Sequence, residues 1–323
     1  MAPGCFPGQN RGMSRAIVAT AYGGPEVLSL IDVDPGEPGP GELLLEVHAA
    51  GVNPADWKTY MGAFGTDPSR LPLRMGHEAA GTVLAVGPDA GAISPGDEVI
   101  VSPAPGAYAE RLIVRVANAV PKPPMMSWEK AAGLLLAGTT AMHTVVATRV
   151  GSGDTVLVHG ASGGVGSMAV QIARARGARV IGTASPANHE YLIDIGVIPV
   201  TYGPGLADRV RAATRGSIDA AIDTVGTAEA LDVSVALVAD RQRIATIAGF
   251  GHGAVLRVQL LGNGPGADPG TEIRRTARQG LVDLVIAGRL DVRVAATYRL
   301  ADAARAHRAG IAGQASGKLI LLP

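Results

Sequence analysis

The stretch VLVHGASGGVGSMAVQIA, residues 156–173, runs from an apolar strand-like segment through four closely spaced glycines into a helix-favouring segment. Glycine in such a loop permits a tight turn, lets a phosphate approach the backbone and lets the helix pack closely on the strand. An anion can then bind the free N–H groups at the positive end of the helix. The alternative is a glycine-rich turn with only a structural role. The pattern predicts that a dinucleotide pyrophosphate is bound by Gly160, Ser162, Gly163, Gly164, Val165 and Gly166.

Strand and helix patterns alternate along the middle of the chain. Such alternation, with right-handed crossovers, gives a parallel sheet covered by helices on both faces. The sequence therefore predicts an α/β fold with a Rossmann-type, doubly wound parallel sheet. After the first strand, the strand-like segments are 178–184, 197–202, 218–226, 243–249 and 254–261, and the helix-like segments are 164–177, 186–196, 205–216, 228–238 and 271–290.

The amino-terminal part of the chain has a different pattern, with short β-like segments and turns rich in Gly and Pro. This pattern predicts a β-rich, barrel-like domain. Ser127, after a run of prolines, is a candidate N-cap of a helix and marks the predicted change of domain. The tail reads as strand, helix and strand, and its last strand is a candidate to return to the first domain. The β-like segments are 15–20, 43–52, 79–87, 97–102 and 109–116.

Composition and charge argue against several classes of protein. The 28 basic residues balance the 28 acidic ones, so no broad surface for nucleic acid or an anionic membrane is expected. No apolar run approaches the roughly 20 residues that a membrane-spanning helix needs. Cys5 is the only cysteine, which excludes an intrachain disulfide and a Cys-based zinc site and fits a reducing cytoplasm. Residues 1–13 lack the apolar segment of a signal peptide and are expected to form a disordered leader.

The end of the second strand in the α/β part bears on the choice of cofactor. Sites selective for NAD usually place an Asp or Glu there, where it binds the ribose 2′-hydroxyl. This chain has no acid there and offers the hydroxyls of Thr183 and Ser185, which can bind a 2′-phosphate. The sequence therefore favours NADP(H) over NAD, although no Arg or Lys stands in the loop to pair the phosphate. The alternative for Ser185 is that it only caps the following helix.

Six short motifs follow one another in an order that resembles a known family. They are GVNPADW, GHE, GAYAE, AGTTA, GASGGVG and GKLIL. Together they resemble the medium-chain dehydrogenase/reductases, specifically the zinc-free quinone oxidoreductase (zeta-crystallin-like) branch. The resemblance implies a GroES-like catalytic domain formed by 14–124 and 289–323, a Rossmann NADP-binding domain at 125–288, and a cleft between them. It also implies a homodimer or homotetramer joined through the nucleotide domains. The segment 254–261 is a candidate pairing strand, with an ordinary edge strand as the alternative.

The resemblance also bears on zinc. Zinc-dependent alcohol dehydrogenases of this superfamily place a Cys at the position of Asn53, a His at that of His77 and a Cys at that of Leu136. Only His77 remains here, and a catalytic zinc needs three protein ligands. Ala55 stands where the family's proton relay has a hydroxyl. No metal site is therefore expected, and His77 is expected to be a hydrogen-bonded residue at the domain interface.

A nicotinamide cofactor can reduce a quinone or an enone without a metal if hydrogen-bond donors stabilise the carbonyl oxygen. In the resembling family, the Asn at the position of Asn53 lies near the nicotinamide and the substrate, and its amide can donate to that oxygen. The alternative is that Asn53 only holds the turn before Pro54. Asp56 also matches a family position, either as a site residue or as a turn or interface residue.

The family's tyrosine donor has no direct counterpart in this chain. Many members carry that tyrosine at the position of Lys58 or of Phe64. Lys58 and Tyr60 remain as candidate catalytic donors, although a solvated surface Lys is commoner and helix geometry can point Tyr60 elsewhere. Trp57 either lines the pocket or fills the core.

Further cofactor contacts follow from the resemblance and from position. Thr140 matches a family Thr at the nicotinamide end, and the alternative is a helix Thr bonded to its own backbone. Tyr202 matches a family Tyr on the adenosine side. Gly249 and Phe250 follow the fifth strand at the cofactor side of the sheet, where glycine permits close approach of a ligand.

The sequence thus predicts an enzyme that transfers a hydride from NADPH to a small-molecule quinone or α,β-unsaturated carbonyl. One alternative is a catalytically silent NADPH-binding structural or regulatory protein, which the missing tyrosine donors favour. Another is a standalone enoyl reductase of polyketide or fatty-acid synthesis, which shares the fold.

Overall fold

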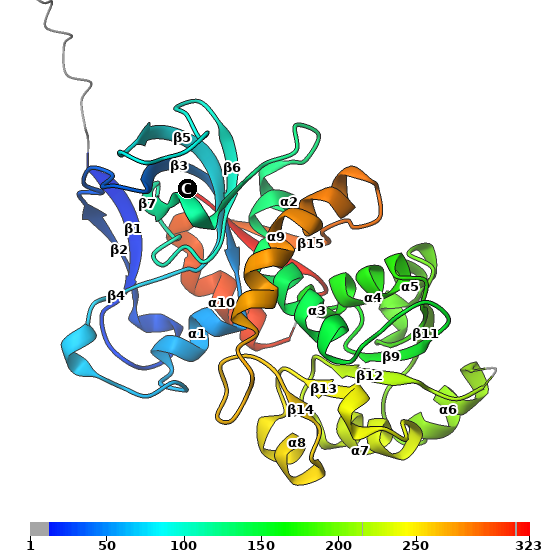
Figure 1. Cartoon of the computed structure of the whole chain (residues 1–323). Coiled ribbons are helices and arrows are strands. Elements are labelled where there is room, and N and C mark those ends of the chain that lie inside the picture. The colour runs from blue at the N-terminus through cyan, green and yellow to red at the C-terminus, as the bar shows by residue number, and fades with distance from the viewer. Residues whose placement is uncertain (1–12, 215, 314) are drawn as a thin grey trace, which may run out of the picture.

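The structure is a computed structural model that describes residues 13–214, 216–313 and 315–323. A β-rich unit built from both ends of the chain lies beside an α/β unit built from its middle (Figure 1). Residues 1–12 of the expected leader lie outside the described residues. The predicted fold class, a Rossmann-type α/β domain with a GroES-like β-rich domain, is confirmed.

The α/β unit contains a parallel sheet of six strands within the described residues, in the order β11-β10-β9-β12-β13-β14. Numbered from the first of these strands in the chain, the order is 3-2-1-4-5-6, which is that of a doubly wound dinucleotide-binding fold. Ligands of such sheets bind beyond the carboxyl ends of the strands, where the order reverses between β9 and β12. The strands are β9 (Thr155–His159), β10 (Arg179–Thr183), β11 (Ile198–Val200), β12 (Ala220–Asp223), β13 (Ile244–Thr246) and β14 (Gln259–Leu260).

Both faces of this sheet are buried, which explains why its strands read as continuous apolar runs. Val156 and Val158 of β9 join a core with helices α3, α4, α5 and α9, whereas Leu157 between them joins a second core with α6 and α7. The alternation follows from the two-residue period of a strand. The helices are α3 (Leu135–Ala147), α4 (Gly164–Ala175), α5 (His189–Asp194), α6 (Leu206–Ala213), α7 (Ala228–Leu237), α8 (Phe250–Leu256) and α9 (Thr271–Ile286).

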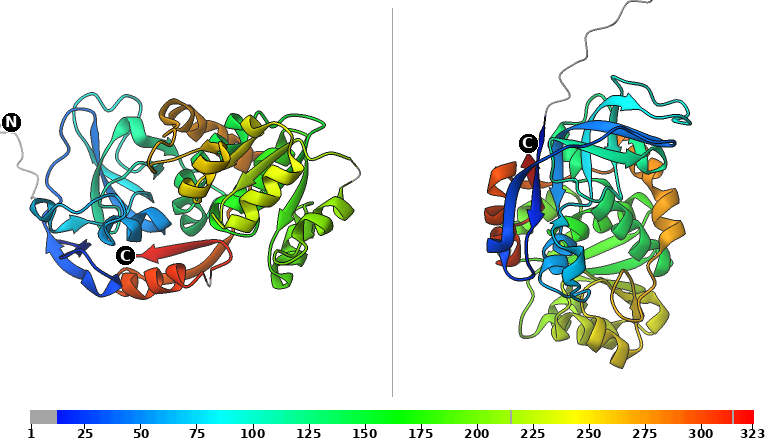
Figure 2. Two further views of the ribbon diagram at one scale, coloured as in Figure 1. Left: turned by 90° about the horizontal axis from the view of Figure 1, so that it is seen from below. Right: turned by 90° about the vertical axis from the view of Figure 1, so that its left-hand side faces the viewer.

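In the described part of the β-rich unit, a sheet has the order β15-β16-β3-β5-β6-β8, with β7 also paired to β3, and a smaller sheet has the order β2-β1-β4. β16 (Lys318–Leu322) pairs antiparallel with β3 (Glu42–Val52), so the expected return of the last strand to the first domain is confirmed. Figure 2 shows this C-terminal segment beside the N-terminal strands. The others are β1 (Ser14–Ala19), β2 (Leu28–Val33), β4 (Leu73–Arg74), β5 (Ala79–Val86), β6 (Glu98–Val101), β7 (Arg111–Arg115), β8 (Ala119–Pro121) and β15 (Val294–Arg299).

Short helices connect these strands. α2 begins after Ser127, whose hydroxyl accepts a hydrogen bond from the backbone N–H of Lys130, as expected of an N-cap. α2 packs on β3 and β5, so the chain passes from one unit to the other between α2 and α3. The α-helices are α1 (Pro54–Tyr60), α2 (Trp128–Ala132) and α10 (Ala303–Ile311), and the 3₁₀ turns of the chain are Pro25–Val27, Pro68–Arg70, Val116–Asn118, Pro186–Asn188, Arg241–Arg243 and Leu300–Asp302.

The strand predicted at 254–261 is wrong for its first half. Helix α8 covers Phe250–Leu256, and only β14 (Gln259–Leu260) is extended. Val255 is 77% exposed, so the apolar run is not buried as a strand of this sheet would be. Arg257 ends the helix in the left-handed region, at φ +57°, before the chain enters β14. β14 is the edge of the sheet, and pairing of this edge with a second copy stays a prediction.

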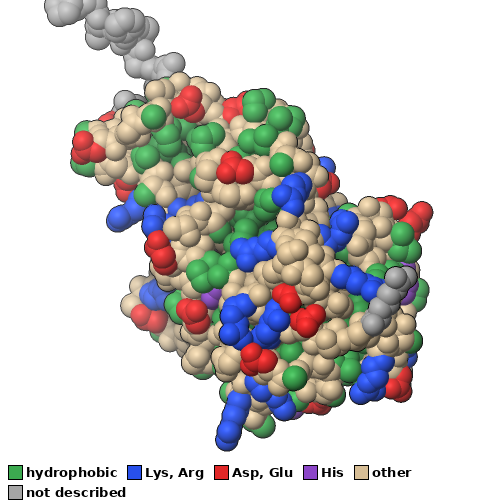
Figure 3. Space-filling model, turned by 45° about the vertical axis from the view of Figure 1, so that its right-hand side comes forward, with side chains coloured by type: hydrophobic (Ala, Val, Ile, Leu, Met, Phe, Trp, Pro, Cys, Tyr) green, Lys and Arg blue, Asp and Glu red, His purple; other side chains and the backbone are tan. Residues whose placement is uncertain are grey.

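The surface carries both signs of charge in mixture. Figure 3 shows Lys and Arg side chains interspersed with Asp and Glu on one face, in keeping with the balanced charge. None of the described helices has the length and apolarity to cross a membrane. The cytoplasmic location stays a prediction.

Candidate active site

A cleft of about 880 Å³ lies at the junction of the two units. Its size is typical of sites for small ligands, which often form between domains. The β-rich unit contributes the end of β3, helix α1 and the segment that leads into β16, and the α/β unit contributes the ends of its strands. Of the residues predicted as site residues, the cleft is lined by Asn53, Lys58, Gly160, Ser162, Gly163, Gly164, Val165, Thr183, Ser185 and Tyr202.

The glycine loop connects β9 to α4 at the carboxyl edge of the sheet. Gly160 has φ +73°, which favours glycine, and a Cβ on Gly166 would collide with the backbone oxygen of Gly160. Because Gly166 has no side chain, α4 can pack closely against the loop. Gly166 itself does not line the cleft. The backbone N–H groups in the first turn of α4 have no intrahelical acceptors and lie at the positive end of a 12-residue helix. This arrangement fits the pyrophosphate of a dinucleotide.

The last residue of β10 and the residues after it also line the cleft. Thr183 accepts a hydrogen bond from the backbone N–H of Gly160 (3.1 Å), which joins the two loops. The Ser185 hydroxyl makes no cap bond and accepts instead from Asn188 Nδ2 (3.0 Å). Tyr202 is 56% exposed, on a loop whose carbonyl groups bind the Arg209 guanidinium. Hydroxyl and amide groups, rather than a cation, are therefore available in this part of the cleft.

Several predicted contacts lie away from the cleft surface. The Thr140 hydroxyl donates to the backbone oxygen of Leu136 (2.8 Å) and accepts from Arg274 Nη1 (2.7 Å). Phe250 packs against Gly264 at the start of α8, and neither it nor Gly249 lines the cleft. Direct contacts of these residues with a cofactor stay predictions.

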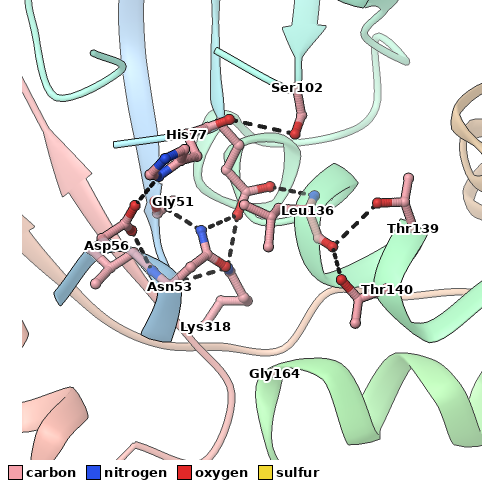
Figure 4. A network of polar contacts seen from close by, with 12 residues as sticks. Gly51, Asn53, Asp56, His77, Ser102, Leu136, Thr139, Thr140, Gly164 and Lys318 are labelled. Carbon is pink, nitrogen blue, oxygen red and sulfur yellow. Dashed lines mark hydrogen bonds and ion pairs between the residues drawn. The ribbon is translucent and has the colours of Figure 1, made fainter. Parts of the chain in front are cut away.

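A buried polar cluster lies where β3, β5 and β16 approach the glycine loop (Figure 4). Lys318 Nζ donates to Asn53 Oδ1 (2.5 Å) and to Glu78 Oε1 (2.8 Å). Because lysine can only donate, the amide oxygen of Asn53 faces it and the amide nitrogen faces the carboxylate. Asn53 Nδ2 donates to Glu78 Oε1 (2.9 Å) and, at 3.3 Å, to the backbone oxygen of Gly51. The Lys318 side chain is 4% exposed and that of Glu78 is fully buried.

A second buried network runs from Asp56 to the far side of α1. The Asp56 carboxylate accepts from His77 Nδ1 (2.5 Å) and from the Tyr108 hydroxyl (2.7 Å). Tyr108 also contacts His307 Nε2 (3.1 Å), and Tyr60 contacts His307 Nδ1 (2.9 Å). A neutral His307 protonated at Nε2 satisfies both contacts. Tyr60 is therefore fully buried against α10 and does not line the cleft, and a direct contact of Tyr60 with a substrate has no support in this geometry.

The charges of this network are set by burial and by hydrogen bonding. Burial raises the pKa of Asp56, but the hydrogen bond and charge of His77 outweigh it and lower the pKa overall. The hydrogen bond to Asp56 raises the pKa of His77 above the ordinary histidine value. Burial lowers the pKa of His307 to about 4, so this residue is neutral. The buried carboxylate thus favours a charged His77.

Stability is expected to fall as pH rises through the raised pKa of His77. The folded state binds this proton more tightly than the unfolded state, so the contribution is complete below about pH 6.5 and is lost above it. Three other histidines have lowered pKa values, namely His143, His159 and His307. Their titration therefore changes the stability of the protein below that pH. Urea unfolding at a series of pH values measures this fall, which the His77→Gln variant should lack. An equal fall in that variant would assign the effect to other groups.

The positions of the zinc ligands in related alcohol dehydrogenases do not fit a metal here. The Asn53 oxygen faces the Lys318 ammonium, and Leu136 has no donor side chain and gives its backbone N–H to Glu78 Oε2 (2.8 Å). His77 Nδ1 binds Asp56. Across residues 13–214, 216–313 and 315–323, no three His, Cys, Asp or Glu side chains are grouped to hold a metal ion. The positive charge at this cluster is the ammonium group of Lys318.

Four residues of the two networks were assigned no role from the sequence, and they are Glu78, Tyr108, His307 and Lys318. Glu78, Tyr108 and Lys318 lie within the motifs GHE, GAYAE and GKLIL, where they served only as family markers. A lysine followed by the apolar run LILL is a signal that was available, because a buried lysine requires a partner. His307 stands in the segment AHRAG, which gives no comparable signal.

Two family patterns match the chain. The family described as "Alcohol dehydrogenase GroES-like domain" matches residues 39–150, and the family described as "Zinc-binding dehydrogenase" matches residues 164–264. The first match covers most of the N-terminal β-rich segment, and the second begins within the glycine loop.

The chain is similar to known proteins over nearly its whole length. A quinone oxidoreductase of Pseudomonas aeruginosa is 33% identical over 96% of this chain and 100% of its own. The native structure of a mycobacterial protein complexed with NADPH is 35% identical, with a TM-score of 0.83 over 97% of this chain and 100% of that one. The structure of an NAD-dependent alcohol dehydrogenase is 30% identical, with a TM-score of 0.84 over 96% of this chain and 99% of that one.

Proposed function

Because the chain belongs to the quinone oxidoreductase branch of the medium-chain dehydrogenase/reductase superfamily, we propose that it transfers a hydride from NADPH to a quinone or an α,β-unsaturated carbonyl without zinc. The observation that carries the proposal is a single cleft lined both by the glycine loop and by the Asn53–Lys318 pair. The pair stands where a zinc-dependent relative would hold its metal.

The choice of NADPH rests on the end of β10. No carboxylate stands after Thr183 to repel a 2′-phosphate or to bind a 2′-hydroxyl, and the hydroxyl of Ser185 and the amide of Asn188 line the cleft there. The mycobacterial relative with NADPH supports the same choice.

Bound NADPH supplies the hydride, and negative charge then develops on the carbonyl oxygen of the acceptor. We assign the stabilisation of that oxygen to Asn53, which lines the cleft. One of its amide hydrogens is held by Glu78, whereas the other makes only a 3.3 Å contact with the backbone oxygen of Gly51 and can be given to the acceptor. Lys318 holds the amide oxygen at 2.5 Å, which fixes the orientation and strengthens the amide as a donor.

This role predicts a loss of turnover when Asn53 is replaced. NADPH oxidation is measured with a panel of quinones and enones, for the wild type and for Asn53→Ala. Removal of an oxyanion donor costs about a hundredfold to a thousandfold in kcat, and the variant should lose about that much while still binding NADPH. Asn118→Ala is the matched control, because its amide donates to the backbone oxygen of Pro103 away from the cleft.

Two results would contradict the proposal. The first is tight NADPH binding with no turnover of any acceptor. The second is one zinc ion per chain in purified, active protein.

A catalytically silent NADPH-binding protein is the second candidate. One observation favours it: Tyr60 is turned from the cleft towards His307, so the tyrosine hydroxyl nearest in sequence cannot replace the missing family donors. Cofactor titration followed by the turnover assay separates the two candidates.

A further inference from the structure

The four lysines of the chain differ in their partners. Lys122 pairs with Glu98 (2.8 Å), Lys130 with Asp291 (2.6 Å) and Lys318 with Glu78 (2.8 Å). Lys58 is the exception: among the described residues its ammonium group has no hydrogen-bonding or ionic partner. Its side chain is half-buried and lines the cleft.

The surroundings of Lys58 leave its charge uncompensated. Asp56 lies two residues away on α1, and positions two apart do not face each other on a helix. The Asp56 carboxylate is fully buried and bound to His77 and Tyr108. The cleft's one lining carboxylate among the described residues is Glu229, which accepts from the backbone N–H of Gly203, next to Tyr202. The part of the cleft lined by α1 therefore carries a free positive charge.

The cleft that Lys58 lines also has aromatic and apolar lining residues. Trp57 lines the cleft, and a Cβ on Gly310 of α10 would meet its ring at 2.7 Å, so the indole rests directly on that helix. A lysine can lay its stem on such a surface and present its ammonium group to the open space. An anion that reaches this site leaves water for a partly enclosed pocket, where attraction between charges is stronger than in bulk water.

We propose that Lys58 binds an oxyanion carried by the electron acceptor, so that the preferred substrates are quinones or enones with a carboxylate or an ionised hydroxyl. This inference rests on the proposed function and names its substrate class. The reducible carbonyl lies at Asn53 and the anion lies at Lys58. Asn53 is the N-cap of α1 and Lys58 lies in its last turn, and both residues line the cleft.

The test compares a methylnaphthoquinone bearing a propanoate side chain with its methyl ester, which has the same ring and no charge. Binding to the protein saturated with NADP⁺ is measured by calorimetry, without turnover, and NADPH oxidation is measured separately. The carboxylate should bind the wild type about tenfold to a hundredfold more tightly than the ester, as a charged hydrogen bond implies. Binding of a hydroxynaphthoquinone, whose hydroxyl is ionised at neutral pH, is measured in the same way. Whichever of the two anions binds more tightly is the anion that the site favours.

Variants at Lys58 decide whether this residue is responsible. Lys58→Met should remove the preference for the carboxylate, and Lys58→Arg should restore most of it. Lys130→Met, which deletes a lysine outside the cleft, should keep the wild-type preference. Added salt should weaken binding of the carboxylate and not of the ester.

Equal affinity of the wild type for carboxylate and ester would overturn the inference, as would a preference that survives in Lys58→Met. Preferential binding of the carboxylate with no NADPH oxidation would leave the anion site standing and would instead contradict the proposed function.

Discussion

Replacing Lys318 with methionine is expected to destabilise the protein by about 3–5 kcal/mol, as removal of one partner of a buried ion pair does. The side chain of Lys318 is 4% exposed, and its ammonium group is bound by Glu78, Asn53 and the backbone oxygen of Val52. Methionine has a similar length and fills the same space. The variant therefore leaves the Glu78 carboxylate buried without a counter-ion, and urea unfolding at neutral pH measures the loss.

The matched control is Lys130→Met. Lys130 makes an ion pair of similar length with Asp291 (2.6 Å), but the two side chains are 42% and 67% exposed. Exposed pairs contribute about 0–1 kcal/mol, so this variant should remain near the wild type. The double variant Lys318→Met/Glu78→Gln removes both buried charges and should be more stable than Lys318→Met alone. Equal losses of stability in Lys318→Met and Lys130→Met would contradict the larger contribution to stability expected of the buried pair.

Lys318 connects stability to chemistry, because its ammonium group also orients the amide of Asn53. Its stem lies against the start of α4, where a Cβ on Gly164 would meet the Lys318 side chain at 3.2 Å. One lysine therefore joins β16 to the candidate donor on one side and to the glycine loop on the other. The double variant, although more stable than the single one, should not recover turnover, since no cation then holds the Asn53 oxygen.

The fold was predictable where its causes are local. The apolar residues 156–158 predict a buried strand, and the glycines at 160, 163, 164 and 166 predict the tight turn that follows it. The alternation of strand and helix periods in the following segments predicts the parallel sheet. The strand prediction for 254–261 was wrong for its first half, because a short apolar run is compatible with either a strand or a helix. Only the packing of α8, with Gly253 buried and Val255 exposed, distinguishes the two.

The candidate site was predictable only in part, because its polar groups come together only when the C-terminal segment folds back beside the N-terminal strands. Asn53 and Lys318 are 265 positions apart, and Tyr60 and His307 are 247 apart. No spacing along the sequence gives these contacts. The sequence identified Asn53 and Lys58 as candidate donors, but it could not show that Asn53 is held by a lysine or that Tyr60 faces α10. Those directions are set by the packing of α1 between the two networks.

The glycine loop gives the second large expected effect, in the variant Gly166→Ala. The new methyl group would collide with the backbone oxygen of Gly160 and lie 2.8 Å from its carbonyl carbon. Backbone atoms cannot rotate away as a side chain can, so α4 must move from the loop. Overpacking of this kind costs about 1–3 kcal/mol. Because the same movement displaces the N–H groups that face the pyrophosphate, NADPH affinity should fall at least a hundredfold, as titration with NADPH measures.

Gly280→Ala is the control for this substitution. Gly280 lies within α9, and a Cβ there meets no atom within 4 Å. Alanine in a helix interior is about 0.5–1 kcal/mol more favourable than glycine, so this variant should gain stability and keep its NADPH affinity. The two variants add the same methyl group, and only the one beside Gly160 should affect the cofactor. Wild-type NADPH affinity in Gly166→Ala would mean that the cofactor does not depend on the packing of α4 against this loop.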